Sequence, residues 1–253
     1  SPIPVEIDAY MNGTVVDVHT NEGCVIQNRG TLIQGIFGLG GEVKGPLNIV
    51  VEEPTESLKP EYITASMKGQ IVVGGAYLPA ETVKRAQACG VAGIVTGGFD
   101  YDDIKDLLGY EVGVAITGGE DLGLTIVVTE GFGHIQMAPG TFNLLKSHHA
   151  RPASMNGATQ IRAGVIRPEV IVTAQDHETS TDKWTPPEPV GIQIGDAVRG
   201  IRTPYFGRLG RVKSLPVELS VMASETKVRT MEVVFDDGTV ALMPRANVES
   251  IDG

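Results

Sequence analysis

The pattern of hydrophobic and polar positions predicts several different regions along the chain, and the first is rich in short strands. In this region apolar and polar residues alternate in short bursts, which is the period of half-buried strands. Asn12-Gly13 and Asn21–Gly23 interrupt the alternation, and Asn-Gly is a strong hairpin signal. The bursts cover Val5–Tyr10, Thr14–His19, Gly23–Gln27 and Leu47–Val51. They predict a small β module, a barrel or sandwich, over residues 1–66.

Within this module the stretch Gly35–Gly45, GIFGLGGEVKG, raises the question of a nucleotide-binding loop. The dinucleotide fingerprint requires a glycine where Val43 stands, and Pro46 leads into a strand rather than a helix. We therefore expect a tight glycine loop between two strands.

Residues 69–173 follow a different pattern, in which an apolar run, glycines and an amphipathic segment recur three times. Each recurrence predicts a strand, a turn and a helix. The expected strands cover 70–74, 91–96 and 124–129, and the expected helices run from Pro79 to Gly90, over about 100–108 and over about 138–149. Strands that alternate with helices indicate a central α/β domain with a mainly parallel sheet over residues 67–173.

Glycines and hydroxyl side chains follow the carboxyl ends of these strands, and ligands of open α/β sheets bind outside those ends. Glu130 adds a carboxylate there. Arg162 and Arg167 bracket a predicted strand, and an arginine that reaches Glu130 could hold an anionic substrate or form a structural ion pair. The candidate ligand-binding residues are Gly74, Gly75, Thr96, Gly97, Gly98, Thr129, Glu130, Gly131, Arg162 and Arg167. The alternative is that the glycines only form tight turns, and Asp100, Asp102 and Asp103 already satisfy the dipole of the second helix.

The segment 174–190, AQDHETSTDKWTPPEPV, is polar and contains three prolines, which predicts an extended linker. We expect Trp184 to fix this linker to a domain surface. Beyond it, residues 191–253 contain short strands expected over 197–202, 209–214, 228–235 and 239–243, and strands this short and close predict a small closed barrel.

The composition limits the partners. The formal net charge is -11, and residues 191–253 carry as many basic as acidic residues, so the negative charge lies in residues 1–190, which would repel a polyanion. We expect Cys24 and Cys89 to be buried, because they lack any metal-ligand spacing. The histidines show no metal motif, so we expect no metal, no cofactor and no catalytic residues. The sequence shows neither a membrane span nor a leader, and we expect a cytoplasmic protein.

The stretch Gly195–Val212, GDAVRGIRTPYFGRLGRV, resembles the KOW motif of certain ribosomal proteins and transcription elongation factors. The resemblance implies an SH3-like barrel over residues 191–253. It also implies a contact surface for protein or for nucleic acid, formed by Arg202, Tyr205, Phe206, Arg208, Arg211 and Arg245. In a nucleic-acid complex Phe206 would stack on a base and the arginines would face phosphates.

Together with IQGIFGLGGE, VAITGGEDLGLTIVVTEGFG and NGATQIRAGVIRPEVI, the chain resembles a family of uncharacterised bacterial KOW-domain proteins. The resemblance implies a barrel-sandwich-like N-terminal module and a central domain of the swivelling β/β/α type, with no established activity. We expect a non-enzymatic binding or assembly protein that self-associates. The alternatives are a small-molecule or enzymatic site at the glycine-rich strand ends, and RNA or DNA binding through the C-terminal barrel.

Overall fold

The computed structural model describes residues 8–100, 102–103, 105, 115–116, 122–160, 166–174, 191–202, 204–216, 219–221 and 227–251. These residues are mostly β-structure with few helices. The chain divides into two compact units: residues 1–160 with 166–182, and residues 161–165 with 183–253. Residues 175–190 lie outside the described part, and they contain Trp184 and all but the first residue of the expected linker.

An eight-stranded mixed sheet forms the first unit. Its spatial order is β3 (Gly30–Gln34), β12 (Glu169–Thr173), β10 (Pro152–Asn156), β5 (Glu42–Ile49), β6 (Ile71–Val73), β7 (Gly93–Phe99), β9 (Thr125–Phe132) and β4 (Phe37–Leu39). The strands β5, β6, β7 and β9 run parallel, whereas the other pairs are antiparallel. The expected mainly parallel sheet is therefore only half of the observed one. Strands from the expected modules 1–66 and 67–173 also belong to this one sheet.

The two ends of this strand order, β3 and β4, are consecutive in the chain. Between them the N–H of Gly35 donates to Pro168 O at 2.8 Å, and the N–H of Ile36 donates to Val128 O at 2.8 Å. The chain thus passes from pairing beside β12 to pairing beside β9 within two residues, while β3 and β4 remain the two edge strands of the order. A Cβ at Gly35 would lie 2.7 Å from Val128 O, so only glycine fits this corner. The expected glycine loop is in part this corner and in part the buried strand β4.

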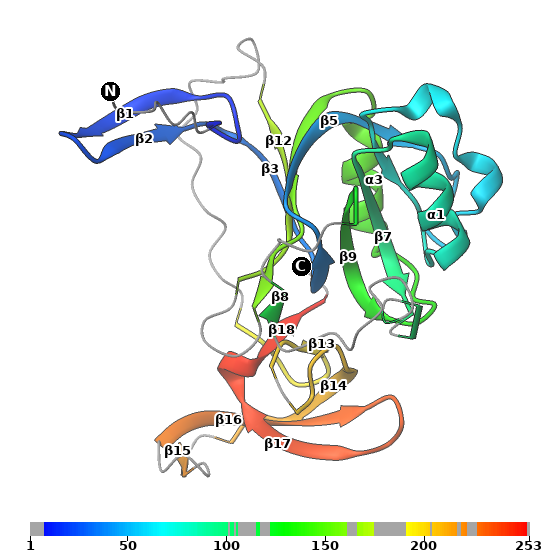
Figure 1. Ribbon diagram of the computed structural model, residues 1–253. Helices are drawn as coiled ribbons and strands as arrows, with labels where there is room; N and C mark the ends of the chain where they lie inside the picture. The colour runs from blue at the N-terminus through cyan, green and yellow to red at the C-terminus, as the bar shows by residue number, and fades with distance from the viewer. Residues whose placement is uncertain are drawn as a thin grey trace. The chain divides into compact units, whose positions relative to one another are not determined.

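Two helices described in full flank the parallel strands, as Figure 1 shows. Helix α1 (Ala80–Cys89) starts after Pro79 and ends at Gly90, whose φ of 70° is left-handed, so this prediction is confirmed. Helix α3 (Pro139–Ser147) also lies where it was predicted. Of the expected helix over 100–108, four residues are described: Asp100 is not helical, whereas Asp102, Asp103 and Lys105 are. Short 3-10 turns cover Pro60–Tyr62 and Ala65–Met67, and a two-residue ladder joins β8 (Ala115–Ile116) to β11 (Thr159–Gln160).

The core of the first unit lies around β6, β7 and β9. All of β6 and β7 is buried, as is usual for parallel strands covered on both faces. Large buried side chains come from the strands and from both helices, among them Leu47, Ile94, Ile126, Val83 and Phe142. Because burial of such a side chain contributes roughly 1.5–3 kcal/mol, this region stabilises the unit.

The hairpin of β1 (Thr14–His19) and β2 (Gly23–Gln27) contrasts with this core. Both strands were predicted, but Figure 1 shows the hairpin extending away from the sheet of its unit, and nearly all of its residues are exposed. Cys24 is exposed and Cys89 is only half-buried, so the expectation of two buried cysteines is wrong.

The second unit is an antiparallel sheet of β13 (Ala197–Gly200), β14 (Leu209–Ser214), β15 (Leu219–Val221), β16 (Lys227–Phe235), β17 (Val240–Pro244) and β18 (Val248–Ser250). The order is β15-β16-β14-β13-β18, and β17 pairs with β16. A 3-10 turn, Arg245–Asn247, precedes β18. The core of the second unit contains Val198, Val212, Met231, Val233 and Phe235. The predicted strands are present, whereas the SH3-like barrel stays a prediction.

Candidate functional site

The glycines predicted to surround a ligand lie at the carboxyl ends of β6, β7 and β9, but other parts of the chain fill the space beside them. A Cβ at Gly75 would lie 2.5 Å from Glu56 O, and a Cβ at Gly98 would collide with Gly133 O. A Cβ at Gly97 would lie 2.4 Å from Ile135 O. The glycines therefore allow two loops, residues 53–58 and 133–137, to pack directly on the strand ends. Glycines that serve close packing of the chain agree with the alternative that they form tight turns.

The polar residues of the predicted site are engaged within the fold. Glu130 is 5% exposed, and its Oε1 accepts the N–H of Ala138 at 3.0 Å, at the start of α3. A carboxylate at the N-terminus of a helix interacts favourably with the helix dipole. Thr129 donates to Thr96 O at 3.3 Å, and Arg167 donates to Gly35 O at 2.9 Å, at the β3–β4 corner. Gly74 and Gly131 are buried, and Arg162 lies outside the described residues.

Four other side chains meet at the same edge, on the solvent side of the packed loops. The Ser57 hydroxyl lies 3.1 Å from His134 Nε2. The His134 ring stacks on the Tyr77 ring, with centroids 5.5 Å apart and planes 19° from parallel. The Tyr77 hydroxyl donates to Asp103 Oδ2 at 3.1 Å. We call Ser57, Tyr77, Asp103 and His134 the strand-end cluster.

The parallel topology brings the strand-end cluster together, since each member follows a different strand. Ser57 follows β5, Tyr77 follows β6, Asp103 follows β7 and His134 follows β9. Burial and the hydrogen bond to Asp103 raise the pKa of Tyr77 to about 12, so its phenol stays a neutral donor at physiological pH. None of the four cluster residues, Ser57, Tyr77, Asp103 and His134, was predicted as a site residue. The signal that could have found them was their place after predicted strands.

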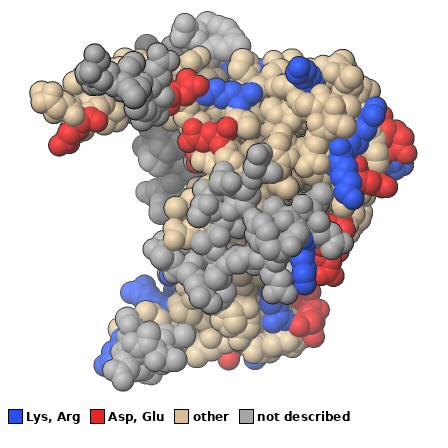
Figure 2. Space-filling model, in the orientation of Figure 1, with Lys and Arg blue, Asp and Glu red and all other residues tan. Residues whose placement is uncertain are grey.

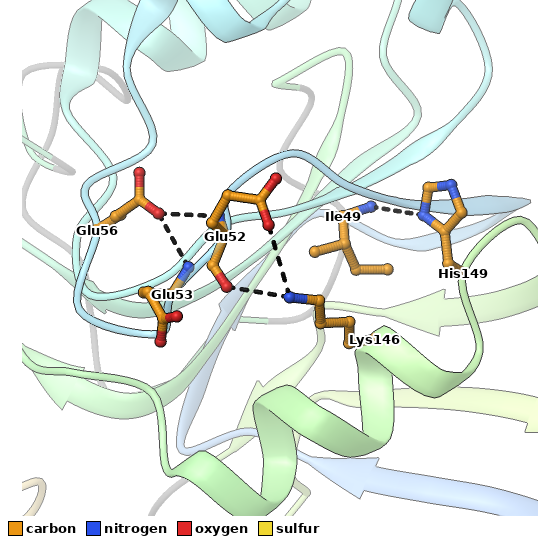
Figure 3. A network of polar contacts seen from close by, with 6 residues as sticks. All are labelled: Ile49, Glu52, Glu53, Glu56, Lys146 and His149. Carbon is orange, nitrogen blue, oxygen red and sulfur yellow. Dashed lines mark hydrogen bonds and ion pairs between the residues drawn. The ribbon is translucent and has the colours of Figure 1, made fainter.

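A polar network holds the segment between β5 and Ser57, as Figure 3 shows. Glu56 Oε1 accepts the N–H groups of Glu52 and Glu53 at 2.8 and 2.9 Å. Lys146 of α3 donates to Glu52 O at 3.1 Å and lies 3.8 Å from the Glu52 carboxylate. The N–H of Ile49 donates to His149 Nδ1 at 3.3 Å. The loop that carries Ser57 is thus attached to α3 through Lys146, and the end of β5 is attached to His149 just beyond α3.

The exposed hairpin is the second candidate site. The register pairs Val15 with Ile26 and Val18 with Cys24, and a bulge places Val16 between them. Val15, Val16 and Val18 are 52%, 52% and 68% exposed. We call the side formed by Val15, Val16, Val18, Cys24 and Ile26 the apolar hairpin face, because side chains alternate along a strand and the bulge shifts that alternation.

The charged groups lie on the other side of the hairpin, which also carries the exposed Val25 opposite Asp17. Asp17 and His19 are two residues apart, and their side chains approach to 3.7 Å. Thr14 and Gln27 form the pair at the base of the hairpin. The hairpin is therefore amphipathic, with charge on one side only.

The base of the hairpin lies beside a cavity of about 110 Å³ that opens to solvent. The walls include Tyr10, Met11 and Asn12 from the base, and Ser154 donates to Tyr10 O. Burial, followed by the charges of Glu169 and Glu42, raises the pKa of Tyr10 well above its usual range. These contacts fix the position at which the hairpin leaves the sheet.

Most of the predicted contact residues of the second unit serve its internal packing. Arg208 lies 4.1 Å from the Phe235 ring centroid and 2.5 Å from Asp237 Oδ2. Hydrogen bonds from Thr239, and then the Arg208 charge, lower the pKa of Asp237. The Tyr205 ring stacks on Phe235 at 5.1 Å.

The other predicted residues divide into two groups. Arg245 donates to Thr230 O at 3.0 Å and to Pro216 O at 3.2 Å, so it links two segments of the sheet. Arg211 is exposed and donates to Gly195 O at 3.2 Å, whereas Arg202 and Phe206 are half-buried. Arg199, which the sequence analysis did not single out, is buried and pairs with Glu249 at 3.2 Å.

Charges are mixed on the molecular surface. Figure 2 shows lysine and arginine atoms beside acidic atoms over much of the face in view, rather than in one continuous basic area. Among the described residues, no group of three or more His, Cys, Asp or Glu could hold a metal ion. No helix in that same part of the chain has the length and apolarity needed to cross a membrane.

Comparison of the chain with family models and with curated proteins finds no match. The resemblance of residues 195–212 to the KOW motif therefore stays a prediction.

Proposed function

We propose that this chain is a binding and assembly protein that associates with a second copy of itself through the apolar hairpin face. The observation that carries the proposal is the exposure of three valines along one side of a two-stranded ribbon. An isolated hairpin of two strands is marginally stable in water, and apolar patches of this kind mark contact sites. Contact with a partner would both stabilise the hairpin and remove its valines from water.

A second copy fits this face better than a charged partner does. The apolar hairpin face carries no ionisable carboxylate or amine, so it is complementary to itself in a two-fold contact, where the same surface is used by both copies. Asp17 and His19 lie on the opposite side, where a face-to-face contact leaves them in solvent. No charge of either hairpin strand then has to be buried, which would be costly.

The size of the face predicts the strength of the association. Stable interfaces bury about 800 Å² per partner, and five residues of the size of valine, cysteine and isoleucine supply less than that. We therefore expect a weak dimer whose population rises with protein concentration.

The second unit supports contacts with protein rather than with nucleic acid. Arg208 and Arg245 are held by Asp237 and by backbone carbonyls. On strand β17, Val240 and Leu242 are exposed. An outward apolar pair on a strand suits a protein surface, whereas phosphate recognition requires accessible basic side chains, and of the predicted contact arginines only Arg211 is exposed. We propose that a KOW-type barrel forms here and presents β17 to a protein partner.

The test is sedimentation velocity of the full chain over a roughly 100-fold concentration range, which spans about 2.7 kcal/mol of association free energy. The wild type should shift toward a dimer as concentration rises, and Val18→Asp should remain a monomer. The matched control is Thr14→Asp, which adds the same charge on the polar side of the same strand and should still dimerise. A wild type that stays monomeric throughout, or dimerisation of Val18→Asp at the wild-type concentration, contradicts the proposal.

A cross-link tests the contact itself. Packed sheets lie about 10 Å apart, so a bismaleimide of that span should join Cys24 of two copies. Cys24→Ala should abolish the covalent dimer, and Cys89→Ala should leave it unchanged. Association should persist or strengthen in high salt, because salt screens repulsion between two chains of net charge -11. Binding to nucleic acid would instead weaken steeply with salt.

A further inference from the structure

The strand-end cluster has the arrangement of a reactive site, and it is independent of the hairpin. Ligands of parallel sheets bind outside the carboxyl ends of the strands, and the cluster takes one side chain from the segment that follows each of four neighbouring parallel strands. The buried glycine turns close the space beneath it. Any substrate would therefore meet Ser57, Tyr77 and His134 from solvent.

Ser57 and His134 have the geometry of a nucleophile and its base. Their polar atoms, Oγ and Nε2, are 3.1 Å apart, which is within the reach of about 2.6–3.2 Å that such pairs require. Ser57 is half-buried and His134 is exposed, so both are accessible. We propose that Ser57 is a nucleophile, that His134 is its general base, and that this edge hydrolyses small carboxylic esters.

Tyr77 and Asp103 act as positioning residues. Catalytic bases are oriented by a third group, and here the nearly parallel stack on Tyr77 holds the imidazole ring. Asp103 in turn holds the Tyr77 hydroxyl. The arrangement resembles a triad in its logic, but a ring stack replaces the hydrogen bond between base and carboxylate.

The backbone around the cluster is preorganised. The N–H of Leu58 donates to Tyr77 O at 2.8 Å, and the N–H of Ile135 donates to Ala76 O at 3.0 Å. The loops that carry the nucleophile and the base are thus each bonded to the segment that carries Tyr77. The Glu56 and Lys146 contacts of Figure 3 restrain the same loop from its other end. Such support reduces the motion of catalytic groups.

The reaction proceeds in two balanced steps. Ser57 Oγ attacks the ester carbonyl while its proton passes to His134 Nε2, and the alcohol leaves with that proton as the carbon–oxygen bond breaks. Water then attacks the acyl-serine and gives a proton to His134, which returns it to Ser57 as the carboxylic acid departs. Hydrolysis needs no further reactant.

The charges around the cluster select the substrate. The carboxylates of Asp103 and Asp100 both act on the Tyr77 phenol, which places negative charge beside the site. Esters with neutral or cationic acyl groups are therefore preferred over anionic ones.

The experiment treats the full chain with a fluorophosphonate probe and locates the adduct by peptide mass spectrometry, while p-nitrophenyl acetate hydrolysis is followed in parallel. The wild type should be labelled at Ser57 and show a burst. Ser57→Ala should lose both, whereas Ser66→Ala, which changes an exposed serine of the turn before β6, should retain both. His134→Ala should slow labelling by roughly 10²–10⁴-fold, the usual contribution of a general base.

The positioning role has its own readout. Tyr77→Ala should slow labelling of Ser57, and Tyr77→Phe, which retains the ring stack, should restore most of the rate. A wild type without an adduct at Ser57, or hydrolysis that survives Ser57→Ala, overturns the proposal. Val18→Asp should leave labelling unchanged, so failure of this inference and failure of the assembly proposal are distinguishable.

Discussion

The hairpin β1–β2 and the strand β7 are both apolar β-structure, but they have opposite surroundings. Every residue of β7 is buried between neighbouring strands and covering segments, whereas the hairpin exposes most of its residues. Both segments are rich in the β-branched residues that favour strands. Local propensity is therefore enough to form a strand. Packing partners decide whether the side chains of that strand stabilise the fold or remain available for association.

The largest expected effect comes from the crowded end of β7. Gly98→Ala should destabilise the protein by about 3 kcal/mol, because its Cβ would meet Gly133 O and the loop would have to move. Thermal denaturation measures the change. The control is Gly140→Ala in α3, where the Cβ meets open space and should stabilise by roughly 0.5–1 kcal/mol. Equal melting temperatures for the two variants would contradict the close packing.

The same substitution in both regions tests the comparison directly. Val95→Ala removes two methyl groups from a fully buried position of β7 and should cost about 2 kcal/mol. Val18→Ala in the hairpin should change the free energy of unfolding of a dilute sample by less than about 0.5 kcal/mol. Urea denaturation gives both values. A large loss for Val18→Ala in dilute protein would show that the hairpin packs within its own chain.

The smallest expected effect concerns pH at the strand-end cluster. The folded pKa of Tyr77 is raised from 10.0 to about 12, so at pH values between these the unfolded phenol loses its proton while the folded one keeps it. The unfolded state then binds fewer protons, and stability falls as pH rises from 10 to 12. Tyr77→Phe should weaken this fall, measured by denaturation at each pH. It should also remove a late step from the phenolate absorbance titration. An unchanged titration would argue against the Asp103 contact.

The candidate sites show why prediction from the sequence succeeded only in part. Thr96, Gly97, Gly98 and Glu130 were expected at or just beyond strand ends, because a glycine after an apolar run is a local signal, and they lie within the second halves of β7 and β9. Their role differs from the expected one, because the loops that fill the edge come from distant parts of the chain. Ser57 and His134 are separated by 77 residues, and no local period relates them.

The sequence by itself determined the local elements. Pro79 and Gly90 bound α1, and apolar runs define β6, β7 and β9, since these signals depend on neighbours within a few residues. Only the tertiary structure decided that residues 30–49 share a sheet with residues 71–173, that the chain changes its pairing partner from β12 to β9 at Gly35, and that the segments after four strands bring one side chain each together. Those outcomes depend on hydrogen bonds and close contacts between segments far apart in the chain, which hydrophobic periodicity does not encode.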